Sequence, residues 1–167
     1  RLLRGEEFVC LWRAGSCHIH AGDPEAARPL LERARQLGDA LWDEGALDPR
    51  AYLGCRGNLA VLLRDQFDHA AAEALLRDNL ARQRALRQDR REIAKTLGNL
   101  GELLSFMDRF EEAEQTLQQA LEAMEAVYPE EVPRELCYLG NLSLRRGDHQ
   151  AALARYARGL ERNAGVT

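Results

Sequence analysis

The chain has 167 residues, of which 46% are apolar and 30% charged, and its formal net charge is −4. This size and apolar content suit one compact domain or a short array of repeats, and the acidic balance argues against a nucleic-acid-binding domain, which carries a basic excess. No signal peptide is visible, and no apolar run reaches the roughly 18 residues that span a bilayer.

Helical periodicity predicts four pairs of helices and no strands, because no segment alternates with a period of two. The helices are expected over about 6–20 and 24–43, 51–63 and 68–87, 90–106 and 109–127, and 133–145 and 149–162. Aspartates that suit the N-cap position precede the second helix of the first three pairs, at Asp23, Asp68 and Asp108. Gly22-Asp23 makes the first turn, Pro24 suits the first helical position, and Gly147-Asp148 repeats this turn.

Small residues recur in the first helix of each pair at intervals of 45, 41 and 39 residues, and an alanine follows each of them 12 residues later. The first set is Gly15, Ala60, Gly101 and Gly140, and the second is Ala27, Ala72, Ala113 and Ala152. A small side chain on one helix leaves room for a large one on its partner, so these positions predict close helix crossings. A constant offset inside pairs that repeat at a varying interval predicts conserved helix pairs and variable connectors, with units of about 5–45, 50–88, 90–128 and 132–163.

The third unit resembles the tetratricopeptide repeat (TPR) through Leu100-Gly101, Leu104, Phe110, Ala113, Leu117 and Ala120. The last unit repeats the pattern with Leu139-Gly140, Gly147-Asp148, Ala152 and Tyr156. The units exceed the typical 34 residues, so they are similar to the longer repeats of kinesin light chains and of bacterial regulatory proteins. The resemblance implies one all-α domain over 1–167, a right-handed superhelical solenoid of four helix pairs that binds proteins and is not an enzyme.

The residues give little support for catalysis or metal binding. Cys17 and His20 share a helix face, but a structural zinc site needs four ligands, and none of the three serines lies in a G-x-S-x-G motif. A Cys–His nucleophile pair assembled in space stays open. We expect no cofactor, no metal and no catalytic residue, and we expect the four cysteines to be reduced thiols packed as small apolar groups in a cytoplasmic protein.

In the TPR family, the first helix of each pair lines the concave surface of the superhelix. The projected register places five basic and two acidic residues on this face, and the candidate peptide-binding residues are Arg13, Asn58, Val61, Lys95, Asn99, Glu102, Arg134, Tyr138 and Asn141. Asn58 and Asn99 hold equivalent positions and resemble the family's ligands for a peptide backbone. Lys95 and Asn99, one helical turn apart, resemble half of a carboxylate clamp.

The expected ligand is therefore an extended, acidic segment of a protein partner, with no role for nucleic acid or membrane. The alternative for the same surface is a solvated face whose asparagines are tied to neighbouring helices. Two other roles stay open: a regulatory or sensor segment of a larger bacterial enzyme or transcription regulator, and a self-assembly module that stacks through uncapped terminal repeats. The chain begins with Arg1, and 22 of its 23 basic residues are arginine, so we expect a fragment of a larger bacterial protein.

Overall fold

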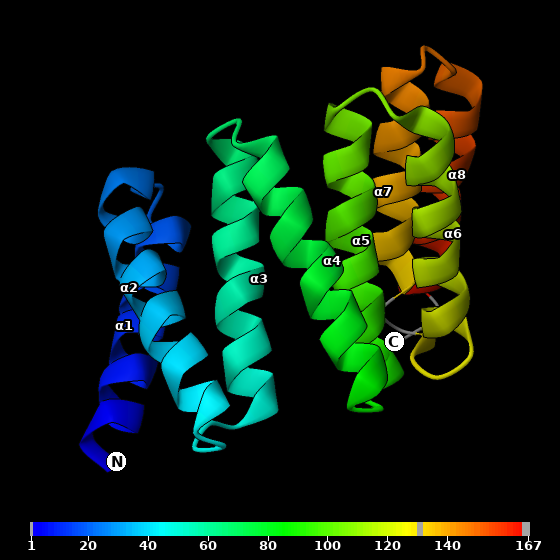
Figure 1. The fold of residues 1–167 in the computed structure, drawn as a ribbon. Coiled ribbons are helices and arrows are strands. Elements are labelled where there is room, and N and C mark those ends of the chain that lie inside the picture. The colour runs from blue at the N-terminus through cyan, green and yellow to red at the C-terminus, as the bar shows by residue number, and fades with distance from the viewer. Residues whose placement is uncertain (1, 130–131, 165–167) are drawn as a thin grey trace. The chain divides into compact units, whose positions relative to one another are not determined.

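The computed structural model describes residues 2–129 and 132–164, which contain eight helices and no strand (Figure 1). In chain order they are α1 (Leu2–His20), α2 (Pro24–Asp43), α3 (Pro49–Asp65), α4 (His69–Ala85), α5 (Arg90–Phe106), α6 (Phe110–Glu125), α7 (Val132–Arg145) and α8 (His149–Ala164). The predicted ends of α2 and α5 are correct, and the largest difference is at α1, which begins at Leu2 rather than at about Glu6.

The chain divides into two compact units, and the first runs to Leu75. It contains α1, α2, α3 and the beginning of α4. Helix α1 packs along α2, and α3 packs against both of them (Figure 1). The largest buried side chains of this unit, each at most 2% exposed, are Phe8, Leu31, Leu41, Tyr52 and Leu59.

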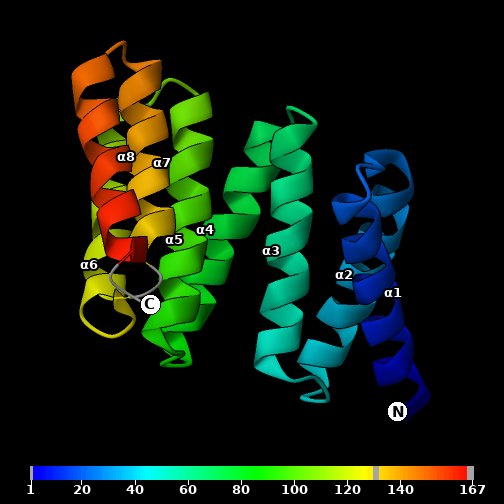
Figure 2. The same cartoon turned by 180° about the vertical axis from the view of Figure 1, so that it is seen from behind.

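The second unit begins at Leu76 and contains the rest of α4 and α5 to α8. Helices α5 and α6 form one antiparallel pair, α7 and α8 form the next, and α7 packs against both α5 and α6 (Figure 2). The largest buried side chains of this unit are Leu76, Leu103, Leu104, Leu117, Met124, Leu136 and Leu142. The all-α architecture of consecutive helix pairs that the sequence predicted is confirmed.

The predicted close crossings lie at the small residues. A Cβ atom added to Gly101 would lie 2.5 Å from Cγ of Leu117 and 3.3 Å from the carbonyl oxygen of Ala113. In the first unit, a Cβ added to Gly15 would lie 2.6 Å from Cγ of Leu31. Such distances are shorter than van der Waals contact, so α5 and α6 can approach this closely only because position 101 has no side chain.

The four turns that join the helices of each pair share one backbone geometry. In the first, the amide of Gly22 donates to Ile19 and that of Asp23 to His18, which is the Schellman arrangement that closes a helix C-terminus. The residue with positive φ is Gly22 in this turn, and the equivalent residues of the next three turns are Phe67, Asp108 and Gly147.

This alignment corrects one predicted cap. Asp23, Asp68 and Asp148 each accept a backbone hydrogen bond from the first turn of the following helix. Asp108 does not, because it occupies the left-handed position of the turn, and the N-cap of α6 is Arg109, which makes no side-chain cap. The prediction that Asp108 caps this helix is therefore wrong by one residue.

The cysteines also differ from expectation. Cys55 is fully buried, but Cys10, Cys17 and Cys137 are exposed, so the prediction that all four pack as small apolar groups is wrong for three of them. The reason is the helix face on which each lies: the sequence places all four on helices, but only Cys55 points into the core. Burial raises the pKa of the Cys55 thiol to about 12, with a smaller contribution from nearby Asp39.

Candidate functional site

The candidate site of the second unit is the surface that α5 and α7 form together. A Cβ added to Gly98 would lie 3.0 Å from the ring of Tyr138 and 3.0 Å from Oε2 of Glu135, so α7 lies directly on the α5 backbone at this point. One turn to either side, the predicted residues Lys95, Glu102, Arg134 and Asn141 stand on the same two adjoining helices. The two helices therefore form one continuous polar surface.

The basic groups of this surface already have acidic neighbours. The Lys95 ammonium lies 3.1 Å from Oε1 of Glu92 on its own helix, and the lysine side chain is 37% exposed. Arg134 donates to Oε1 of the adjacent Glu135 at 2.6 Å. A ligand carboxylate would consequently share or replace existing partners rather than meet two unpaired cations.

Glu135 is the unusual member of this group, because it is a fully buried acid. Burial raises the pKa of its carboxyl group, and the hydrogen bond and positive charge of Arg134 oppose the shift. Its Oε2 atom has no hydrogen-bond partner among the described residues. The sequence contained a signal for this burial, since Glu135 is in register with Cys55 and Thr96 at intervals of 41 and 39, and both of those residues are buried.

The asparagines differ in what their side chains contact. Asn99 is partly exposed on α5, and its amide makes no side-chain hydrogen bond within the described residues. Asn141 accepts a hydrogen bond from the Tyr156 hydroxyl at 2.7 Å. Within the second unit, Asn99 is therefore the amide that remains available to a ligand, whereas the carbonyl oxygen of Asn141 is engaged.

The other predicted residues belong to the first unit and form a separate group. Asn58 on α3 donates to Oγ of Ser16 on α1 at 2.7 Å, and Ser16 donates in turn to the carbonyl of Trp12. Val61 is half-buried, and Arg13 is exposed on α1. Asn58 thus joins two first helices, which is the alternative that the sequence left open for it.

Comparison with known families and structures identifies the repeat. Residues 50–126 match the sequence model of the family described as tetratricopeptide repeat. No curated protein sequence matches the chain. Among solved structures, BtubC (BKLC) from P. vanneervenii matches with a TM-score of 0.74 and 19% identity, over 90% of this chain and 61% of that one.

Two further solved structures share the fold. A Rap protein, solved in complex with competence and sporulation factor, matches with a TM-score of 0.81 and 20% identity, over 95% of this chain and 43% of that one. PilF of Pseudomonas aeruginosa matches with a TM-score of 0.68 and 26% identity, over 96% and 63%. The chain spans less than two thirds of the length of each of these proteins. None of the helices in the described residues has the length and apolar content needed to cross a membrane.

Proposed function

Because this chain is a tetratricopeptide repeat protein, we propose that it is a non-catalytic protein-binding module whose α5–α7 surface holds an extended, acidic peptide segment. TPR domains generally mediate protein interactions, and the Rap protein of similar fold was solved with competence and sporulation factor. Large, preformed helical-repeat surfaces are the usual binding faces of solenoid proteins.

The observation that carries this proposal is the partly exposed Asn99 amide, which has no side-chain hydrogen bond within the described residues. An amide side chain both donates and accepts, so it can pair with the N–H and C=O groups of an extended peptide. It stands one turn from Lys95 on the same helix. An acidic side chain of the ligand would reach Lys95 while the ligand backbone bonds to Asn99.

A peptide selection against the whole chain tests the proposal. Linear peptides selected from a random display library are expected to be enriched in Asp and Glu. Their affinity, measured by fluorescence anisotropy, should fall as salt rises because exposed charge pairs are screened. Asn99→Ala and Lys95→Glu should each weaken binding about tenfold, the cost of one charge-assisted or peptide hydrogen bond.

Matched substitutions away from the surface serve as controls. Gln119→Ala on α6 removes an exposed amide, and Arg84→Glu on α4 reverses an exposed charge; neither should change the affinity. Urea unfolding of Asn99→Ala should stay within about 0.5 kcal/mol of the parent chain. Unchanged affinity of the selected peptides for both Asn99→Ala and Lys95→Glu would contradict the proposed site.

Self-association is a second candidate function, favoured by exposed leucines on α8. Leu153 and Leu160 lie seven residues apart on one face of this helix and are 69% and 71% exposed. Sedimentation equilibrium over a hundredfold concentration range should then show a rising mass that Leu153→Gln with Leu160→Gln abolishes. A constant monomer mass would exclude this function.

A further inference from the structure

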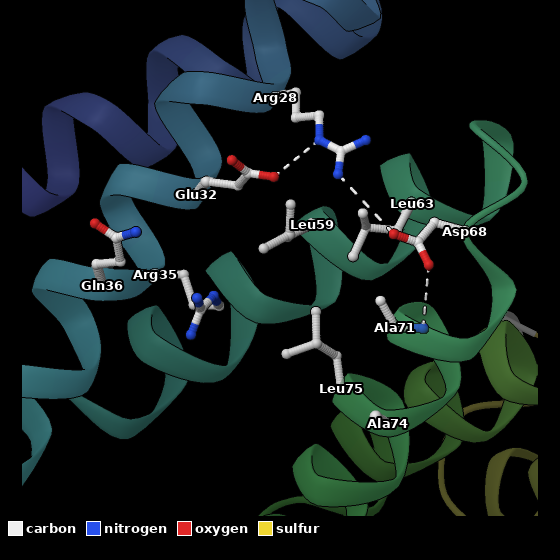
Figure 3. A pocket seen from close by; sticks show the side chains of 10 residues that line it. All are labelled: Arg28, Glu32, Arg35, Gln36, Leu59, Leu63, Asp68, Ala71, Ala74 and Leu75. Carbon is white, nitrogen blue, oxygen red and sulfur yellow. Dashed lines mark hydrogen bonds and ion pairs between the residues drawn. The ribbon is translucent and has the colours of Figure 1, made fainter.

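A pocket of about 480 Å³ opens in the first unit between α2, α3 and the beginning of α4 (Figure 3). This volume is typical of ligand sites, which run from about 300 to 1,000 Å³. Its floor is formed by the buried Leu59 and Leu63 of α3, and its α4 side by Ala71, Ala74 and Leu75. The polar rim comes mainly from α2, where Arg28 and Glu32 stand above the leucines (Figure 3).

The pocket is distinct from the predicted peptide-binding residues of the same unit. A helical residue turns by about 100° relative to the one before it. Leu59 and Leu63 therefore lie on the side of α3 roughly opposite to Asn58 and Val61. Asn58 faces α1 through Ser16, whereas Leu59 and Leu63 face α2 and α4.

Comparison of the repeats shows what leaves the pocket open. At the equivalent positions of the second unit, Arg77 on α4 bonds to Glu112 on α6 at 2.5 Å, and Arg109 also donates to Glu112. These bonds lower the pKa of the Glu112 carboxyl group, with Arg77 as the largest cause. An ion pair thus bridges the second helices of those two pairs.

The first unit lacks this bridge because the residue types differ. Glu32 stands at the register position of Arg77, and Ala71 stands at that of Glu112. The methyl group of Ala71 offers Glu32 no cation across the groove, so Glu32 accepts instead from Arg28 of its own helix at 2.8 Å. The place that a charged side chain fills in one unit is open in the other.

The charges around the pocket favour a cation in that place. Arg28 is shared between Glu32 at 2.8 Å and Asp68 at 3.9 Å. The second arginine of the rim, Arg35, is engaged by Asp39 at 2.7 Å. Three carboxylates therefore surround two guanidinium groups, which leaves the rim one negative charge in excess.

We propose that this pocket binds a basic, apolar segment of a protein partner, with an aliphatic side chain on the Leu59–Leu63 floor and an arginine or lysine at Glu32. The ligand cation takes the role that Arg77 plays opposite Glu112 in the second unit. This site belongs to a different unit from the α5–α7 surface and takes a ligand of opposite charge. Either site can therefore fail in experiment without deciding the other.

Two blocked synthetic heptapeptides test the proposal on the whole, isotope-labelled chain: Gly-Ser-Leu-Arg-Leu-Ser-Gly and its counterpart with Glu in place of Arg. Amide chemical shifts in NMR spectra are recorded during titration. The Arg peptide should cause saturable shifts at Ala71, Ala74 and the amides of α2 around Glu32. A dissociation constant of about 1 mM or below is expected for three engaged side chains. The Glu peptide should bind at least tenfold more weakly.

Two pocket variants and two matched controls complete the test. Ala74→Phe fills the pocket from an exposed position of α4, and Glu32→Lys reverses the rim charge; each should weaken the Arg peptide at least tenfold. Ala70→Phe and Asp43→Lys make the same changes at exposed positions outside the pocket, and both should bind like the parent chain. The spectrum of each free variant reports whether it is folded. Absence of saturable shifts, equal binding of the Glu peptide, or full binding by both pocket variants would each overturn the proposal.

Discussion

Phe67 occupies a backbone conformation that suits glycine, and replacing it should stabilise the first unit. Its φ is +63°, whereas the equivalent turns of the first and last pairs have Gly22 at +73° and Gly147 at +79°. The Phe67 side chain is 83% exposed, and its one printed ring contact is with His69 at 6.0 Å. Phe67→Gly therefore removes backbone strain while giving up little packing.

The expected gain follows from two opposing terms. A residue with a Cβ atom costs about 1–2 kcal/mol in the left-handed region. Glycine loses about 0.5–1 kcal/mol more conformational entropy on folding than alanine does. The balance is a stabilisation of about 0.5–1 kcal/mol, which corresponds to a rise of about 1–4 °C in the unfolding midpoint of a chain of this size.

Urea unfolding followed by circular dichroism, together with scanning calorimetry, measures this change. The reciprocal variant Gly22→Phe provides the control, because it places a Cβ atom at the same turn position of the same unit and should lose about 1–2 kcal/mol. Destabilisation by Phe67→Gly, or a neutral Gly22→Phe, would refute the view that backbone conformation governs these turns.

Three further predictions concern buried side chains. Ala113→Leu should destabilise the second unit by about 1–3 kcal/mol, because the larger side chain overpacks the crossing at Gly101; an unchanged urea midpoint would contradict this. Because the folded pKa of Glu135 is raised above its ordinary value of 4.5, stability should decrease as pH rises from that value through the folded pKa, and Glu135→Gln should flatten this slope in urea unfolding at a series of pH values. With its pKa raised to about 12, Cys55 should resist maleimide at neutral pH until the chain unfolds, whereas the three exposed cysteines should react; labelling of all four in the folded chain, seen by mass spectrometry, would contradict it.

The helix pairs were predictable because their determinants are local or periodic. Small residues at fixed offsets identified the crossings, and Asp23 and Asp68 identified helix starts that the structure confirms. Asp108 misled because an aspartate suits both an N-cap and a left-handed turn residue. Counting from Gly22 and Gly147, which hold the equivalent position, would have placed it in the turn.

The candidate site was less predictable because it depends on contacts between distant residues. The bond between Asn58 and Ser16 joins positions 42 residues apart, and the register alone does not fix the rotation of one helix against the next. The pocket of the first unit arises from a difference between repeats: Ala71 and Ala74 stand where Glu112 and Gln115 follow in the next pair. A search for what the repeats share does not reveal such a site.

Lys95 has a practical consequence for identifying a partner, because it is the one lysine of the sequence. Its ammonium group stands on α5, 3.1 Å from Glu92, with a side chain that is 37% exposed. Reagents directed at side-chain amines therefore have a single target in this sequence, and no cysteine or lysine needs to be engineered. A photoactivatable cross-linker coupled there would turn a transient complex on the α5–α7 surface into a covalent adduct, and mass spectrometry would read both the partner and its contact point from one modified residue.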